Sequence, residues 1–347
     1  MGSIPILIAV VLVALLAVGV WVVVRRALAG PQQSPTNQQE LFASTKAQVF
    51  SVYRGDALAA AAALILGGSG AAVMCLVGSW WGRGYGITYA LAGGVGALVG
   101  LLVYMFYPRP AWVPDEGGRV VAELSPRGPT SFARQWVFVL PLSAAIILIL
   151  GLLLTGSYSA TDENGLHRVF QRRSLSGWGI ESGQVVDVQY NLSANGPFPG
   201  WYYGVPVIIC TLLLIAVVYW ALHRTARAAR PGSADLLGAD SFLRSQRTMF
   251  IMSASSAALA SQVAGLAAIT GTVLAAAHRD PVPTADLDTV AGTIPVEPGH
   301  TFGLILILVS LVIAVAAVML LIKACSTAAG LWSLGGHMQC VRSERVR

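Results

Sequence analysis

The sequence predicts an all-α membrane protein, a bundle of seven transmembrane helices with a small exterior loop or hairpin cap. Seven apolar stretches each approach or exceed the roughly 20 helical residues that cross a hydrocarbon core. None of the 22 Lys and Arg or 16 Asp and Glu residues lies inside them, as expected because a buried charge is costly in a bilayer. Only 11% of the chain is charged, against about 25% in soluble domains. The stretches are 3–24, 57–78, 86–107, 136–155, 202–222, 249–277 and 301–322.

The Lys and Arg residues predict the orientation. Segments 25–56, 108–135, 223–248 and 323–347 hold 17 of them, whereas 79–85, 156–201 and 278–300 hold five. Cytoplasmic loops are the richer in Lys and Arg, so we expect the N-terminus outside and the C-terminus in the cytoplasm of a multi-pass cell-membrane protein. The pI of 9.4 is explained by these loops, and no nucleic-acid partner is predicted.

The first stretch reads as a retained N-terminal anchor helix over 1–24. No basic residue precedes the apolar run, whereas Arg25 and Arg26 follow it directly. A cleavable signal peptide has the opposite arrangement of charge. Residues 25–56 begin with Gly, Pro and amide-rich sequence, which favours a flexible cytoplasmic linker. Helices two to four then occupy 57–155.

The exterior loop 156–201 is expected to form a small hairpin over the outer face of the bundle. Leu166–Gln171 and Gln184–Leu192 both suit strands, the second with alternating apolar residues, as half-buried strands have. The next helix begins with Trp201, Tyr202 and Tyr203. Aromatic residues gather at membrane interfaces, so we predict an exterior aromatic belt here. A ligand lid built from the same three residues is the alternative.

Helices five to seven occupy 202–322, followed by a cytoplasmic tail over 323–347. The loop 278–300 is acidic and broken by prolines, which favours a solvated loop. A divalent-cation site is the alternative, although the acids do not have EF-hand spacing. No metal or cofactor site is therefore predicted. The acids are Asp280, Asp286, Asp288 and Glu297.

Small residues inside the spans predict close helix packing. Gly96 and Gly100 form a GxxxG pair, which lets two helix backbones approach closely. The sixth stretch carries a stripe of small residues four apart: Ser253, Ala257, Ser261 and Gly265. Gln262 lies beside this stripe, and its amide should seek a partner on another helix. A polar path through the bundle, with Thr270 and Thr272, is the alternative.

Five arginines flank the connection between stretches five and six. They are Arg224, Arg227, Arg230, Arg244 and Arg247. We interpret them as a basic collar that contacts anionic lipid headgroups. A docking surface for an acidic cytoplasmic partner is the alternative.

The sequence lacks the residue sets that several intramembrane activities require. A retinal protein needs a lysine in mid-helix, but Lys323 lies at the edge of the seventh stretch, and all five histidines lie at stretch ends or in loops, which disfavours haem. Residues 67–70 read Gly-Gly-Ser-Gly, which resembles the string around the nucleophile of rhomboid-like serine proteases. His278 lies at the rim rather than at mid-depth, so the Ser–His pair that such catalysis needs is unsupported. No catalytic residue is predicted.

The whole chain loosely resembles uncharacterised polytopic membrane proteins of high-GC Gram-positive bacteria. Residues 122–127 (AELSPR) and 196–204 (GPFPGWYYG) carry this resemblance. It implies a bacterial cell-membrane location and transfers no activity. The leading hypothesis is a non-catalytic component of a membrane transport or envelope complex, with a membrane-protein partner or a second copy of itself. A permease for an apolar or amphiphilic solute is the alternative, and a rhomboid-like protease is a remote one.

Overall fold

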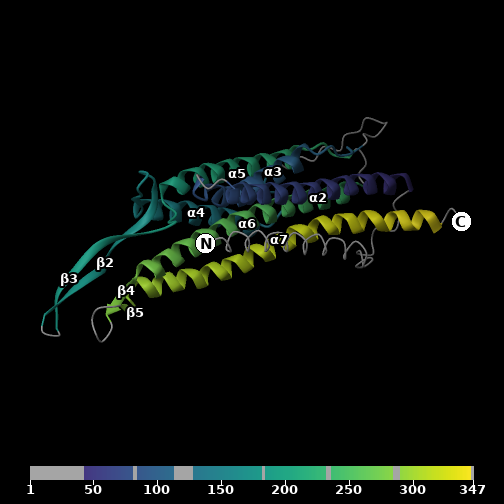
Figure 1. Ribbon diagram of the computed structural model, residues 1–347. Helices are drawn as coiled ribbons and strands as arrows, with labels where there is room; N and C mark the ends of the chain where they lie inside the picture. Colours follow the sequence, from purple (N-terminus) through teal and green to yellow (C-terminus); the bar gives the residue numbers. More distant parts are fainter. Residues whose placement is uncertain are drawn as a thin grey trace.

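The computed structural model is a mostly helical bundle (Figure 1). It describes residues 43–80, 84–112, 128–181, 184–231, 236–283 and 290–344. Six helices in these segments are long and apolar enough to cross a membrane, so the chain has the architecture of a multi-pass membrane protein. The predicted anchor helix over 1–24 lies outside the described residues. The helices are α2 (Ala43–Trp80), α3 (Ile87–Phe106), α4 (Trp136–Ser157), α5 (Trp201–Arg227), α6 (Leu237–Ala277) and α7 (Gly299–Glu344).

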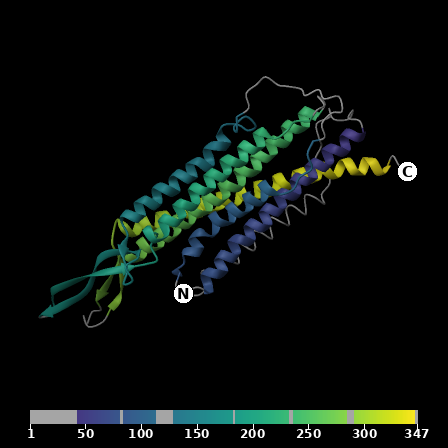
Figure 2. The same ribbon diagram turned by 90° about the horizontal axis from the view of Figure 1, so that it is seen from above.

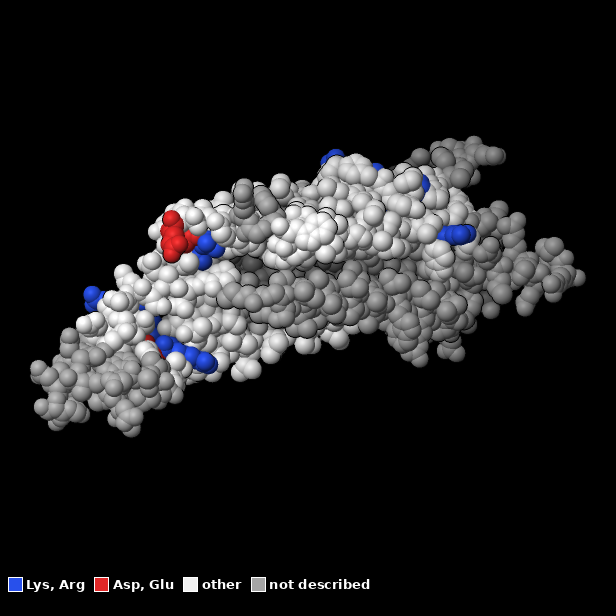
Figure 3. Space-filling view, in the orientation of Figure 1, with Lys and Arg blue, Asp and Glu red and all other residues white. Residues whose placement is uncertain are grey.

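Alternate connections between the helices meet at the same end of the bundle. The β hairpins lie at one end and the C-terminus lies at the other in both views (Figures 1 and 2). We call these the hairpin end and the basic end, because the arginine-rich connections belong to the second. Figure 3 shows charged side chains toward both ends and uncharged atoms between them on its described surface. The sequence predicted this separation of charge, and which end faces the cytoplasm stays a prediction.

Exposed aromatic side chains mark both ends of the apolar zone. Phe106 and Trp136 are 61% and 56% exposed at the basic end, and Trp80 and Tyr158 are 87% and 65% exposed at the hairpin end. From Trp136 to Tyr158 along α4 the helical rise is about 33 Å. This separation matches a hydrocarbon core of about 30 Å bounded by aromatic residues at both interfaces.

Two hairpins form the hairpin end. β2 (His167–Glu181) pairs antiparallel with β3 (Gln184–Asn195), and β1 (Ala160–Thr161) lies on the other side of β2. The predicted hairpin is therefore present. Its base packs against the end of α6 through Phe170 and Arg172, and its strands then extend beyond the ends of the helices in Figure 1. β4 (Arg279–Pro283) and β5 (Val290–Pro295) form a second hairpin where the sequence indicated an irregular loop. Its prolines suggested a loop, yet proline is tolerated on edge strands, and both strands are edges.

Three helices continue past the basic end and enclose a second hydrophobic core. Residues 43–56, expected within a linker, form the beginning of α2, and α7 continues well beyond its apolar stretch. The side chains in this core come from α2, α6 and α7, with Trp112 packed against them. The basic end thus has a small folded extension rather than loops alone. The buried members are Val49, Val52, Tyr53, Ala57, Leu236, Ala239, Leu243 and Leu331.

The GxxxG pair of α3 packs against α2. A Cβ atom on Gly96 would lie 2.7 Å from the carbonyl oxygen of Gly67, and one on Gly100 would lie 2.8 Å from that of Ala63. The two backbones therefore approach within a distance that only glycine allows. The GxxxG face of α3 is therefore buried against α2 of the same chain.

The small-residue stripe of α6 is divided between the core and the surface. Ser253 and Ala257 are buried, while Ser261 and Gly265 are exposed. No heavy atom of the described residues lies within 4 Å of a Cβ atom placed on Gly265, apart from those of its own helix backbone and chain neighbours. The exposed half of the stripe thus leaves a small-residue surface on α6.

Candidate functional site

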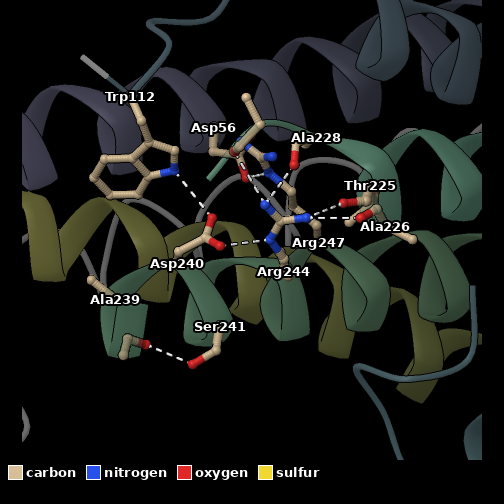
Figure 4. Close-up of polar contacts among 12 residues, drawn as sticks. Asp56, Trp112, Thr225, Ala226, Ala228, Ala239, Asp240, Ser241, Arg244 and Arg247 are labelled. Atoms are coloured by element: carbon tan, nitrogen blue, oxygen red, sulfur yellow. Dashed lines mark hydrogen bonds and ion pairs between the residues drawn. The ribbon is translucent and has the colours of Figure 1, made fainter. Parts of the chain in front are cut away.

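A buried ion-pair cluster lies at the basic end and joins α2, α5, α6 and the segment after α3 (Figure 4). Its first centre is Asp56 of α2, which is fully buried. Arg109 places Nη1 2.9 Å from Oδ1 of this carboxylate, and Arg247 of α6 places Nε 2.7 Å from Oδ2. One carboxylate therefore holds two guanidinium groups from different parts of the chain.

Local sequence fixes the direction of Arg109. It lies between Pro108 and Pro110, and prolines restrict the backbone on both sides. Its guanidinium carbon is 4.2 Å from the ring centre of Tyr104, and it also donates to the carbonyl oxygen of Tyr104. Stacking on an aromatic ring suits the planar guanidinium and stabilises its position.

The second centre is the pair of Asp240 and Arg244, one turn apart on α6. Arg244 Nε donates to Oδ2 of Asp240 at 2.8 Å, and the Arg244 side chain is 1% exposed. The indole N–H of Trp112 donates to the other carboxylate oxygen at 3.1 Å. Asp240 is therefore held by two donors, and Trp112 joins the segment after α3 to α6.

Arg244 also caps the C-terminus of α5. Its Nη1 donates to the carbonyl oxygens of Thr225 and Ala226 at 2.9 and 3.1 Å, and its Nη2 donates to those of Ala228 and Ala229 at 2.8 and 3.2 Å. The last carbonyls of a helix have no partner within it, and the negative end of the helix dipole attracts a cation. Arg244 thus satisfies α5 and ties it to α6.

The cluster carries an excess of positive charge. Its two carboxylates, Asp56 and Asp240, face the three guanidinium groups of Arg109, Arg244 and Arg247. Arginine stays protonated in proteins, so the cluster is suited to holding four elements together and to attracting anions. Proton transfer by its arginines is not expected.

Two of the five predicted collar arginines are thus turned inward. Arg244 and Arg247 bond within the protein, whereas Arg224 and Arg227 are exposed and Arg230 is partly buried. Sequence reasoning missed Asp56 and Asp240 as their partners. The i, i+4 spacing of Asp240 and Arg244 is a known pairing signal on helices, whereas nothing local links Asp56 to Arg247, which lies 191 residues away.

The aromatic residues at the start of α5 hold the turn between α2 and α3. Tyr203 O–H donates to the carbonyl oxygen of Tyr85 at 2.6 Å, and Tyr202 O–H donates to that of Gly84 at 3.2 Å. The left-handed backbone of Tyr85, with φ 47°, is thereby fixed from outside the turn. Trp201 packs where Gly156 leaves room, since a Cβ atom there would lie 2.9 Å from its ring.

An ion pair connects that turn to the hairpin. Arg168 bonds to Asp162, and its guanidinium carbon lies 3.8 Å from the centre of the Tyr85 ring. Burial alone would raise the pKa of the Asp162 carboxyl, but hydrogen bonds from the N–H groups of Leu166 and Asn164 and from Arg168 hold that pKa below its usual value. This carboxylate is therefore ionised at neutral pH.

Gln262 lies against α3 and α5 without a hydrogen-bond partner for its amide. Both its Nε2 and Oε1 atoms are buried and unbonded. A Cβ atom on Gly94 would lie 2.9 Å from Nε2 of Gln262 and 2.7 Å from Sγ of Cys210. The expected interhelical bond is absent from the described residues, and an unpaired amide remains at the α3–α6 contact.

The described residues of the acidic loop have protein partners. Oδ1 of Asp280 lies 3.4 Å from Nη1 of Arg172 on β2. Oε2 of Glu297 accepts a hydrogen bond from the backbone N–H of Thr301 at 3.2 Å. Asp286 and Asp288 lie outside the described residues. No cluster of three or more His, Cys, Asp or Glu residues that could hold a metal ion occurs in the described part of the chain.

The two residues of the rhomboid-like hypothesis lie at different depths. Ser69 is on an exposed face of α2, about 16 Å along the helix from Trp80 at the hairpin end. His278 follows α6 at that end, and its Nδ1 lies 2.8 Å from the carbonyl oxygen of Leu274. No hydrogen bond joins Ser69 to His278 in the described part of the chain, and their positions favour no nucleophile–base pair.

Comparisons with known proteins returned no match for the chain. No protein-family model matches it, and no curated protein or solved structure is significantly similar to it.

Proposed function

We propose that the protein is a non-catalytic component of a membrane transport or envelope complex in a bacterial cell membrane. In this proposal seven helices cross the bilayer and the N-terminus is outside. The arginine-rich basic end faces the cytoplasm, as the distribution of Lys and Arg favours. The observation that carries the proposal is the free edge of β3, which projects from the hairpin end.

The β3 strand is suited to pairing with another protein. It lies at the edge of the sheet β1–β2–β3, so one row of its backbone N–H and C=O groups has no strand partner within that sheet. Tyr190 and Leu192 point to one face of β3 and are 58% and 70% exposed. They belong to the hairpin that follows α4 at the hairpin end, and this hairpin extends past the helices in Figure 1. We therefore attribute their exposure to a protein contact rather than to lipid acyl chains.

A partner strand would satisfy both features together. Edge strands are usually blunted because they pair readily with other chains. Addition of a strand supplies backbone hydrogen bonds, while alternate side chains supply specificity. The partner of this surface is therefore a protein segment in extended conformation, either from a membrane-protein complex or from a second copy of the chain.

Exchange of Tyr190 and Leu192 for threonine tests this function. Threonine keeps the strand propensity while removing the apolar contacts. From native membranes solubilised in mild detergent, we expect the tagged wild-type protein to carry a stoichiometric partner, quantified by mass spectrometry. The double variant should retain at least tenfold less of it.

The matched control is the exchange of Gln189 and Asn191 for threonine on the other face of the same strand, which should retain the partner. Recovery of the wild-type protein as a monomer, or equal partner recovery with both double variants, would contradict the proposal.

A permease for an apolar or amphiphilic solute is the second candidate, because Gln262 leaves a buried amide without a bond. If this amide contacts a solute, Gln262→Leu should abolish uptake of that apolar or amphiphilic solute into proteoliposomes. If Gln262 only packs, the same exchange removes an unpaired polar group and should leave stability unchanged or raise it by about 1 kcal/mol. Thr272→Val is the control, since Thr272 is exposed and bonds to its own helix. Unchanged uptake with Gln262→Leu would exclude this candidate.

A further inference from the structure

A second surface, independent of the hairpin, lies at the basic end where α3 and α5 meet. It consists of Phe106, Trp220, Arg224 and Arg227, which we call the α5 basic patch. The rings of Phe106 and Trp220 meet edge to face with centres 5.6 Å apart, and the Arg224 guanidinium carbon is 5.7 Å from the centre of the Phe106 ring. Trp220, Arg224 and Arg227 follow one another at helical spacing, so they share one side of α5.

The depth of the patch is that of the lipid headgroups. Phe106 and Trp220 are 61% and 45% exposed. Phe106 is one of the two aromatic residues that mark the basic end of the apolar zone, and the ring of Trp220 contacts it. Arg224 and Arg227 are exposed and lie one and two turns beyond Trp220. An aromatic residue at the edge of the hydrocarbon, followed by arginine outside it, is the arrangement of an interface anchor.

Among the described residues, the charge around the patch is positive. The described carboxylates of the buried cluster, Asp56 and Asp240, are already bonded to Arg109, Arg244 and Arg247. That cluster itself has one more guanidinium group than carboxylates. Arg224 and Arg227 therefore add to the net positive charge of the described residues at one level of the bundle, where an anion would be attracted.

We propose that the α5 basic patch binds the phosphate group of an anionic phospholipid. Arg224 and Arg227 would donate to the phosphate oxygens, since the guanidinium fork matches phosphate geometry. Phe106 and Trp220 would contact the glycerol and the first carbons of the acyl chains. The exposed rings favour a lipid over an acidic protein, because rings at this depth face acyl chains and a soluble partner would leave them uncovered.

The test measures lipid retention by the purified full-length protein in mild detergent. Phosphatidylglycerol and phosphatidylcholine with identical acyl chains are titrated, and bound lipid is counted by native mass spectrometry. We expect the wild-type protein to prefer phosphatidylglycerol. The double variant Arg224→Gln, Arg227→Gln should bind it about thirtyfold more weakly, from the usual contribution of two basic residues at an anionic surface.

A matched control removes the same charge from the other end of the bundle. Arg173 and Arg279 are exposed on the hairpins, so Arg173→Gln, Arg279→Gln should leave phosphatidylglycerol affinity unchanged. A melting curve in lipid-free detergent confirms that both variants fold. Equal retention of the two lipids, or unchanged phosphatidylglycerol affinity in the Arg224 and Arg227 variant, would overturn the proposal. An acidic protein that depends on these arginines, with no effect on lipid affinity, would assign the patch to protein docking instead.

Discussion

Asp56→Asn is expected to destabilise the protein by about 3 kcal/mol, because it leaves two arginines beside a neutral side chain. The carboxylate of Asp56 is fully buried and carries both Arg109 and Arg247. Breaking a buried ion pair typically costs about 3–5 kcal/mol. We expect the lower part of that range, since the side chains of Arg109 and Arg247 are 18% and 13% exposed and water can reach them.

The measurement is reversible unfolding in detergent micelles, followed by the intrinsic fluorescence of the tryptophans. Glu163→Gln is the control, since Glu163 is exposed and loses the same charge, and it should unfold as the wild-type protein does. If Asp56→Asn unfolds like this control, the ion pairs do not hold the basic end together.

A double variant separates the loss of pairing from other effects of the exchange. Asp56→Asn combined with Arg247→Gln removes one carboxylate and one guanidinium group, so less charge is left unpaired. We expect this double variant to be less destabilised than the sum of the two single variants, as in any pair of residues that interact directly. Strict additivity would show that Asp56 and Arg247 act independently.

The apolar stretches could be predicted from sequence because the bilayer imposes a simple rule. A spanning segment must be apolar for about 20 residues, and this rule located the membrane-crossing parts of α2 to α7. It said nothing about where the helices begin outside the bilayer. Residues 43–56 were assigned to a linker on their polar composition, although Val49, Val52 and Tyr53 have the spacing of one helix face. That periodicity was the available signal for the second core.

The candidate site was only partly predictable, because its partners are distant in sequence. Arg244 and Arg247 were recognised as basic residues at a helix entrance, where the general expectation is contact with lipid headgroups. Their inward direction depends on which face of α6 meets α2 and α5. That is decided by tertiary packing, and Asp56 precedes its apolar stretch by one residue with no local feature that marks it as a partner. Arg224 and Arg227 are exposed because none of the described helices packs over that side of α5.

Gly96→Leu is expected to destabilise the protein at least as much as Asp56→Asn does, because it forces α2 and α3 apart. A Cβ atom on Gly96 would lie 2.7 Å from the carbonyl oxygen of Gly67 and 2.9 Å from Cβ of Ala71. The first of these atoms is backbone, so no side-chain rotation can relieve the contact. Overpacking usually costs about 1–3 kcal/mol, and a whole leucine at a helix crossing with no free space should cost about 3 kcal/mol or more.

Gly265→Ala provides the comparison, because the two glycines differ in surroundings and not in helical context. Both lie inside helices that are long and apolar enough to cross a membrane. A Cβ atom on Gly265, however, would meet no heavy atom of the described residues within 4 Å beyond its own helix backbone and chain neighbours. Alanine is about 1 kcal/mol better than glycine within a helix, so Gly265→Ala should match or exceed the wild-type protein in the same unfolding measurement. If both variants are equally stable, the close α2–α3 crossing is not what Gly96 provides. If Gly265→Ala is instead the less stable of the two, the exposed half of the α6 stripe is covered in the protein, by a segment outside the described residues or by another molecule.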